Sequence, residues 1–123
     1  MTREFIWLPS FIVKWKHLGL NDDDMRQLEK ELLENPKVGA VMRGTGGVRK
    51  MRFAYENRGK SGALRVIYVD FEVYRKIYFV DVYQKSEKDN LTMAERNNIR
   101  SAVEVLELAL EQQMGRSGDD EQI

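Results

Sequence analysis

The stretch Ala63–Tyr83, ALRVIYVDFEVYRKIYFVDVY, decides the fold of this chain. Two runs in it, Ala63–Asp70 and Lys76–Tyr83, are rich in β-branched and aromatic residues, which is typical of strands. Only Asp70–Arg75 separates them, so the strands are expected to be antiparallel neighbours. The preceding segment Val48–Tyr55 alternates apolar and basic side chains with a period of two, which predicts a third strand. These three strands form an antiparallel meander.

The N-terminal segments predict one more strand and two helices. Glu4–Leu8 (EFIWL) is short, apolar and aromatic, as expected of a strand. Ser10 is a candidate cap for a first helix that Gly19 ends. Asn21 is a candidate cap for a second helix, which ends at Asn35–Pro36. Two short helices joined in this way form a helical hairpin, and the glycine-rich segment 36–47 that follows is expected to be a loop.

A capping box at Thr92–Glu95 predicts the start of a final helix. Its apolar face is expected to hold Ile99, Ala102, Val103, Leu106 and Leu110. Residues 1–112 are therefore interpreted as one domain, and residues 113–123 as a flexible acidic tail. The predicted class is α+β. A small twisted antiparallel sheet, made of the N-terminal strand and the three-stranded meander, is flanked by the helical hairpin and the C-terminal helix.

Composition excludes several classes of protein. The 123 residues suit one domain, and 42% hydrophobic residues argue against general disorder. The chain has no cysteine, which excludes disulfides, thiol catalysis and zinc–thiolate sites. No apolar run is long enough to span a bilayer, and the N-terminus lacks a secretory signal. We expect a cytoplasmic protein without membrane association.

Positive charge is concentrated in the middle of a neutral chain. The 20 Lys and Arg residues balance 20 Asp and Glu residues overall, yet Glu56 is the only acid in the segment 43–65. Glycines let a backbone approach a ligand closely, and clustered Arg and Lys attract phosphates. The run Gly44–Gly47 leads into a strand rather than a helix, which favours a turn over a phosphate loop. The basic residues of the segment are Arg43, Arg49, Lys50, Arg52, Arg58, Lys60 and Arg65.

Arg65 is the most informative of these residues because it lies inside a strand that is expected to be central. An unpaired buried guanidinium is costly, so Arg65 needs either a carboxylate such as Asp81 or a phosphate from a ligand. The residues alone leave these two possibilities open. The single histidine, His17, is best interpreted as a surface residue at a helix end. The aspartates at 22–24 suit a helix N-terminus better than a cation site.

Several short motifs resemble, in order and spacing, the RelE/HigB family of bacterial toxins, in particular its Gp49-like branch within the RelE/ParE superfamily. The matching residues are Asn35–Gly39 (NPKVG), Gly44–Arg52 (GTGGVRKMR), Gly59–Gly62 (GKSG), Arg65–Tyr68 (RVIY), Tyr83–Glu87 (YQKSE) and Leu91–Thr92. This resemblance implies a toxin of a type II toxin–antitoxin system. It implies a ribosome-dependent mRNA endoribonuclease, or mRNA interferase, that inhibits translation. The RNA 2′-hydroxyl attacks the adjacent phosphate, so no metal and no cofactor is implied.

The same resemblance implies partners and roles for individual residues. The partners are the ribosome, its mRNA and a cognate antitoxin with a helix-turn-helix fold. Arg65 is the candidate for stabilising charge on the scissile phosphate, and Lys60 for polarising it. Lys85 is the candidate for proton transfer, and Tyr83 for orienting or stacking on a nucleotide. The implied RNA-binding residues are Arg58, Lys50, Arg52 and Arg49.

Two departures from the family pattern leave other functions open. Relatives often carry a second glycine after the Lys-Ser-Gly of the turn, where this chain has Ala63, and toxins that grip ribosomal RNA are often strongly basic. One alternative is a non-enzymatic toxin of the same fold that inhibits a protein such as DNA gyrase. Another alternative is an inactive relative that only binds an antitoxin.

Overall fold

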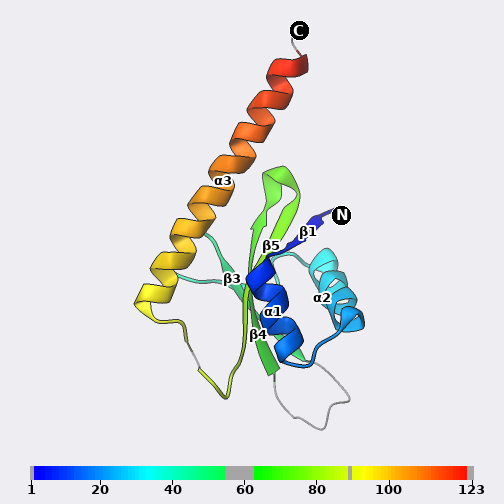
Figure 1. Cartoon of the computed structure of the whole chain (residues 1–123), viewed down its shortest axis with the longest axis vertical. Coiled ribbons are helices and arrows are strands. Elements are labelled where there is room, and N and C mark those ends of the chain that lie inside the picture. Colours follow the sequence, from blue (N-terminus) through cyan, green and yellow to red (C-terminus); the bar gives the residue numbers. More distant parts are fainter. Residues whose placement is uncertain (1, 55–62, 89, 122–123) are drawn as a thin grey trace.

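The computed structural model describes residues 2–54, 63–88 and 90–121, with Ala63 and residues 116–121 described as backbone only. Figure 1 shows a sheet between helices, so the predicted α+β class is confirmed. The predicted polar turn at 57–62 lies outside the described residues. The elements follow the order β1 (Glu4–Trp7), α1 (Pro9–His17), α2 (Asp22–Glu34), β2 (Ala40–Val41), β3 (Arg49–Ala54), β4 (Ala63–Phe71), a 3₁₀ turn (Glu72–Tyr74), β5 (Lys76–Gln84) and α3 (Met93–Glu121).

The sheet has five strands in the order β1-β5-β4-β3-β2. The meander β3–β4–β5 is antiparallel throughout, as predicted. The prediction of an entirely antiparallel sheet was wrong, because β1 pairs with β5 in parallel. Only a tight hairpin forces neighbours to be antiparallel, and β1 and β5 are far apart in sequence. The segment predicted as a loop also contains the two-residue strand β2, which pairs with β3.

The helical hairpin forms as predicted, apart from its first cap. Helix α1 has Leu8 as its N-cap, with no side-chain hydrogen bond, so the prediction of a Ser10 cap was wrong. Pro9 occupies the first helical turn, where its missing N–H leaves no donor unpaired. Gly19 adopts φ 81°, a left-handed conformation that ends the helix. Asn21 and the third helical residue of α2, Asp24, form a reciprocal capping box.

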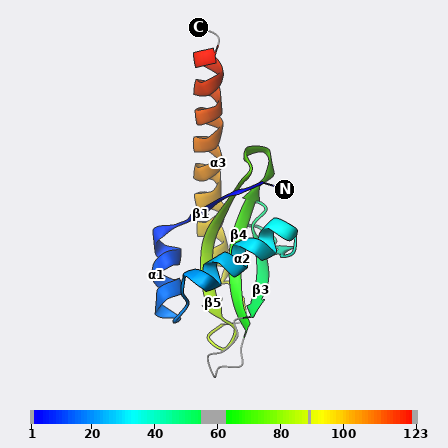
Figure 2. The ribbon, with the colours of Figure 1, turned by 90° about the vertical axis from the view of Figure 1, so that its right-hand side faces the viewer.

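Two hydrophobic cores lie on opposite faces of the sheet. Helices α1 and α2 cover one face and α3 covers the other (Figure 2). The first core, here called the hairpin core, includes Phe11, Trp15, Leu28, Leu32, Phe53, Val66, Tyr68, Ile77 and Phe79. The second, here called the α3 core, includes Val48, Ile67, Val69, Phe71, Tyr83, Leu91, Ile99, Val103 and Leu110. Alternate residues of the central strands therefore serve different cores.

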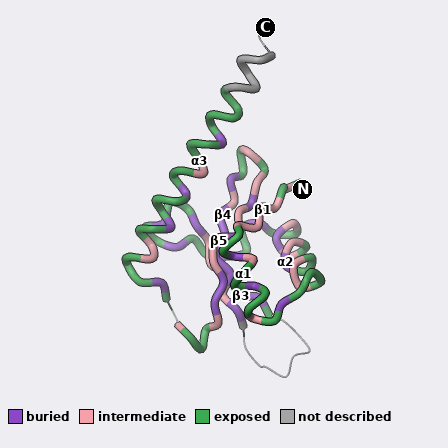
Figure 3. The backbone as a smooth tube through the Cα atoms, viewed as in Figure 1, coloured by how far each residue is buried: buried purple, intermediate pink, exposed green. Residues whose placement is uncertain are grey.

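Helix α3 begins at the predicted capping box. The Thr92 hydroxyl accepts from the Glu95 N–H at 3.1 Å, and the Glu95 carboxylate accepts from the Thr92 N–H at 2.9 Å. Buried positions recur among exposed ones along α3 (Figure 3). The buried positions include Ile99, Val103 and Leu110, whereas Ala102 is exposed. The helix continues past residue 112 to Glu121, and the flexibility of residues 113–123 stays a prediction. No helix in the described part of the chain is long and apolar enough to cross a membrane.

Candidate nucleic-acid interface

Three side chains form a row across the central strands, on the face that carries the α3 core. Arg52 of β3 pairs in register with Arg65 of β4, and Arg65 pairs with Tyr83 of β5. Directly paired residues place their side chains on the same face with Cβ atoms about 5 Å apart. Two arginines are therefore held opposite each other, an arrangement that destabilises a sheet when no anion lies between them. We call Arg52, Arg65 and Tyr83 the basic row.

The basic row contains two buried polar atoms without a hydrogen-bond partner in the described structure. They are Nη1 of Arg65 and the hydroxyl oxygen of Tyr83. The carboxylate considered as a partner for Arg65 lies elsewhere, since Asp81 accepts from Lys14 of α1 at 2.6 Å. Leaving a buried donor unpaired costs about 1–3 kcal/mol, and more when the donor is charged. Two such donors on neighbouring strands mark a place where an external acceptor would be stabilising.

Tyr83 is nearly buried, with 4% of its surface exposed. Burial raises the pKa of its phenol, while the positive charges of Lys88 and Arg65 act in the opposite direction. The hydroxyl is therefore protonated at neutral pH and is available as a hydrogen-bond donor. The Lys88 ammonium lies 4.9 Å from the centre of its ring. This arrangement favours a hydrogen-bonding role for Tyr83 over stacking on a base.

Lys88 is a residue of this region that the sequence analysis did not identify. Its ammonium bonds Glu95 Oε2 at 2.5 Å, and the same carboxylate belongs to the capping box of α3. The hydrogen bond that Lys88 donates to Glu95 raises the pKa of Lys88 and lowers the pKa of Glu95 to about 2. The capping box was visible in the sequence, but the path of the connecting segment that brings Lys88 back to it was not.

The structure brings some of the other predicted RNA-binding residues to the basic row and separates others from it. Lys50 pairs with Ile67 on the α3 face, and its ammonium lies 3.4 Å from the side-chain oxygen of Asn90. Arg49 alternates onto the hairpin face and donates to the carbonyl of Gly39 at 2.7 Å. Lys85 is exposed just after the end of β5. Arg58 and Lys60 lie outside the described residues.

The glycine run Gly44–Gly47 forms a turn, as the sequence analysis predicted. Gly44, Gly46 and Gly47 all have positive φ, which a residue with a Cβ rarely adopts. Between them, the buried Thr45 hydroxyl donates to the Met42 carbonyl at 2.7 Å and accepts from the Val48 N–H at 3.2 Å. The turn therefore joins β2 to β3 and is held by its own hydrogen bonds.

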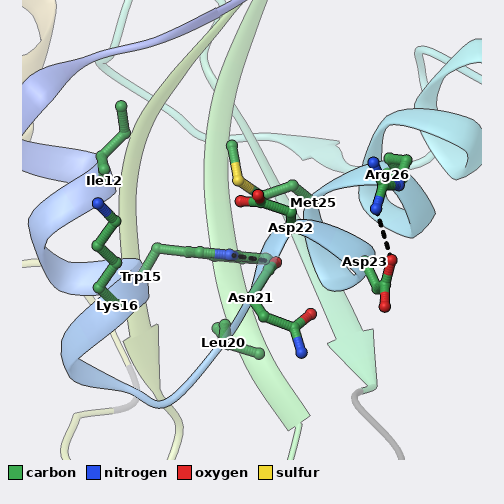
Figure 4. A pocket seen from close by; sticks show the side chains of 9 residues that line it. All are labelled: Ile12, Trp15, Lys16, Leu20, Asn21, Asp22, Asp23, Met25 and Arg26. Carbon is green, nitrogen blue, oxygen red and sulfur yellow. Dashed lines mark hydrogen bonds and ion pairs between the residues drawn. The ribbon is translucent and has the colours of Figure 1, made fainter.

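A pocket of about 340 Å³ lies away from the basic row, between α1 and α2 (Figure 4). Its polar groups are mostly paired, because the Trp15 ring nitrogen donates to the Asn21 carbonyl at 3.3 Å and Arg26 bonds Asp23 at 2.6 Å. His17 is exposed in the last turn of α1, as predicted. Among the described residues, no group of His, Cys, Asp or Glu side chains is placed to hold a metal ion.

Comparison with known proteins identifies the family. A sequence model described as "RelE toxin of RelE / RelB toxin-antitoxin system" matches residues 8–123. The structure is similar to that of E. coli toxin RelE, solved as an arginine-to-alanine double mutant in the free state. That match has a TM-score of 0.50 and 19% sequence identity, and it covers 72% of this chain and 90% of the RelE chain. The chain therefore belongs to the RelE toxin family. It is a toxin of a toxin–antitoxin system, and the family implies an antitoxin partner.

Proposed function

We propose that this toxin is an endoribonuclease that cleaves mRNA on the ribosome, with the basic row as its phosphate-binding centre. The observation that carries the proposal is the pair Arg52–Arg65, two cations directly opposite each other without a carboxylate between them in the described structure. A folded protein tolerates such repulsion where an anion is to be bound. An RNA phosphate meets this requirement, and the RelE family membership makes mRNA the proposed substrate.

In the proposed reaction the RNA 2′-oxygen attacks the adjacent phosphorus. The 2′-hydroxyl loses its proton as the 2′-oxygen–phosphorus bond forms, and the leaving 5′-oxygen takes up a proton as its bond to phosphorus breaks. The products are a 2′,3′-cyclic phosphate and a free 5′-hydroxyl. Negative charge on the phosphate oxygens increases in the transition state, so preorganised donors accelerate the step. Arg65 would supply such a donor through its unpartnered Nη1. The protonated Tyr83 hydroxyl would donate to a phosphate oxygen or to the leaving 5′-oxygen.

For the other predicted site residues, the structure supports some of the proposed roles, and the family resemblance alone supports the rest. Arg52 would bind a phosphate from the exposed end of the basic row, and Lys50 lies on the same face. Lys85, Lys60 and Arg58 keep their proposed roles in phosphate contact and proton transfer, which rest on the family resemblance alone. Arg49 contributes chiefly to structure through its bond to the Gly39 carbonyl, so we propose no direct RNA contact for it.

The experiment that tests this function compares wild type, Arg65→Ala and Arg26→Ala after induction in cells. Arg26 is an exposed α2 arginine paired with Asp23, which makes it a matched control. Primer extension on a translated reporter message should show cleavage within codons for wild type and Arg26→Ala. Arg65→Ala should lose activity by a factor of about 10²–10³, as when one transition-state donor is removed.

Full cleavage by Arg65→Ala would reject this residue assignment. Growth arrest with intact transcripts would reject the nuclease proposal and favour inhibition of a protein such as gyrase.

We also propose that the cognate antitoxin, a helix-turn-helix protein, neutralises the toxin by covering or distorting the basic row. Acidic side chains on an antitoxin helix would complement Arg52 and Arg65. Co-purification with the protein encoded next to the toxin gene should yield a stable complex in which these arginines are protected from chemical modification. A complex that leaves both arginines as reactive as in the free toxin would contradict this mode of inhibition.

A further inference from the structure

We propose that Lys88 is an additional phosphate-binding residue of the basic row, and that Glu95 holds its ammonium in place until an RNA phosphate replaces the Glu95 carboxylate. This inference rests on the proposed RNA-binding function. It adds a residue from the segment between β5 and α3 to a site otherwise built from strands. It also means that the Glu95 carboxylate, which caps α3, competes with the RNA phosphate for Lys88.

Lys88 lies against Tyr83 of the basic row. Its ammonium lies 4.9 Å from the ring centre of Tyr83, and Tyr83 is the direct cross-strand neighbour of Arg65. Its side chain is 33% exposed, so a ligand can reach the ammonium. The Lys88 ammonium lies above a buried phenol whose cross-strand neighbour, Arg65, has an unpartnered nitrogen, so Lys88 extends the positive charge of the row beyond the strands.

The Glu95 carboxylate joins Lys88 to the start of α3. One of its carboxylate oxygens accepts from the Thr92 N–H at 2.9 Å, and the other accepts from Lys88 at 2.5 Å. The start of α3 therefore holds the Glu95 carboxylate in place, and this carboxylate in turn positions the Lys88 ammonium. A partly exposed ion pair of this kind is weak, because water and salt screen it. A phosphate that also contacts Arg65 can displace the carboxylate at little cost.

The two halves of this ion pair should respond in opposite directions. Lys88→Met keeps an aliphatic stem but loses the charge that would contact phosphate. Glu95→Gln keeps a residue able to complete the capping box but loses the charge that competes with phosphate. A purely structural ion pair would instead give two variants with lowered thermal stability and unchanged RNA binding. Lys37→Met is a matched control, because Lys37 also faces a glutamate, Glu72, at 4.0 Å, away from the basic row.

The test measures binding of a fluorescent single-stranded heptaribonucleotide with 2′-O-methyl riboses, which block cleavage, by anisotropy between 50 and 200 mM NaCl. Lys88→Met should reduce the slope of log affinity against log salt by about 0.7, the value of one lost phosphate contact on a single strand. Glu95→Gln should bind roughly two- to fivefold more tightly at 50 mM salt. Lys37→Met should match wild type, and thermal melts should show that all variants are folded.

Two outcomes would overturn the inference. The first is a wild-type slope for folded Lys88→Met, and the second is weaker binding by Glu95→Gln. If Arg65→Met loses binding and cleavage while Lys88→Met keeps both, the role of Lys88 is rejected and the proposed function stands. If the wild type neither binds the oligonucleotide nor cleaves a translated message, both proposals are rejected.

Discussion

Tyr68 and Tyr83 lie on adjacent strands, on opposite faces of the sheet, and their hydroxyl groups have different environments. The Tyr68 hydroxyl accepts from the Gly39 N–H at 3.0 Å and donates to the Pro36 carbonyl at 2.7 Å. The Tyr83 hydroxyl is buried and has no partner in the described structure. The same contrast holds for the two faces as a whole. Among the described residues, the buried side-chain polar atoms of the hairpin face have partners, whereas the α3 face has two without one, Nη1 of Arg65 and the Tyr83 hydroxyl. This difference is what a binding surface on a stable scaffold requires.

The largest expected effect lies on the hairpin face. Trp15 is 1% exposed and its ring lies 5.3 Å from Trp7 and 5.7 Å from Phe53. Trp15→Ala should lower the free energy of unfolding by about 4 kcal/mol, because it leaves a cavity among aromatic rings. Urea unfolding followed by circular dichroism measures the change. A loss below about 1 kcal/mol would contradict the view that this core supplies much of the stability.

Tyr68→Phe should have the next largest effect on stability. Removing its hydroxyl leaves the buried Gly39 N–H and the Pro36 carbonyl without this partner. We expect a loss of about 2 kcal/mol in the free energy of unfolding. The variant should retain wild-type cleavage per folded molecule, since Tyr68 faces away from the basic row. A loss of cleavage by well-folded Tyr68→Phe would contradict the view that the hairpin face contributes to stability and not to cleavage.

Tyr83→Phe should give the opposite combination. Its hydroxyl has no partner to lose, so the free energy of unfolding should stay constant or rise by up to about 1 kcal/mol. Cleavage should fall about tenfold or more if this hydroxyl donates in the transition state. Parallel urea unfolding and primer extension on this variant and Tyr68→Phe provide the comparison. Destabilisation of both variants to the same extent would show that the two tyrosines have equivalent structural roles.

The smallest expected effect concerns pH. The folded-state pKa of Glu95 is about 2, lowered from 4.5 chiefly by the bond from Lys88. A lowered carboxylate pKa contributes stability that is fully present above about pH 4.5 and is lost as the pH falls towards 2. Because both side chains are about one-third exposed, the contribution is at most a few tenths of a kcal/mol. The melting-temperature advantage of wild type over Glu95→Gln should therefore shrink between pH 5 and pH 2. An advantage that is constant with pH would exclude Glu95 as its source.

Much of the fold could be predicted because local signals agreed with the tertiary structure. The alternation that predicted the third strand matches β3 over Arg49–Ala54, and the Asn21 cap, the capping box at Thr92 and the glycine after α1 all correspond to observed features. The parallel pairing of β1 with β5 was not predictable from local sequence, because it depends on where the helical hairpin returns the chain. The first helix begins with proline rather than serine, since a fixed φ and a missing N–H serve as well as a cap.

The candidate site could be predicted only in part. The sequence showed that Arg65 needed a partner, but it left Asp81 and a ligand phosphate as alternatives. Strand register and the Lys14–Asp81 ion pair place that carboxylate elsewhere. Arg49 and Arg52 were both assigned to RNA binding, although the predicted alternation of this strand already placed them on opposite faces, as the structure shows. Lys88 was missed because its role depends on a contact between the connecting segment and α3.

The most direct test of the central claim is the free energy of unfolding of Arg65→Met, measured by urea denaturation on the preparation used for cleavage. Methionine keeps an apolar stem while removing the unpartnered nitrogen and the repulsion from Arg52. The variant should be as stable as wild type or up to about 1 kcal/mol more stable, and its cleavage of mRNA should fall by a factor of about 10²–10³. A variant that is clearly less stable than wild type, or that cleaves normally, would contradict the claim that Arg65 is held unpaired for a phosphate.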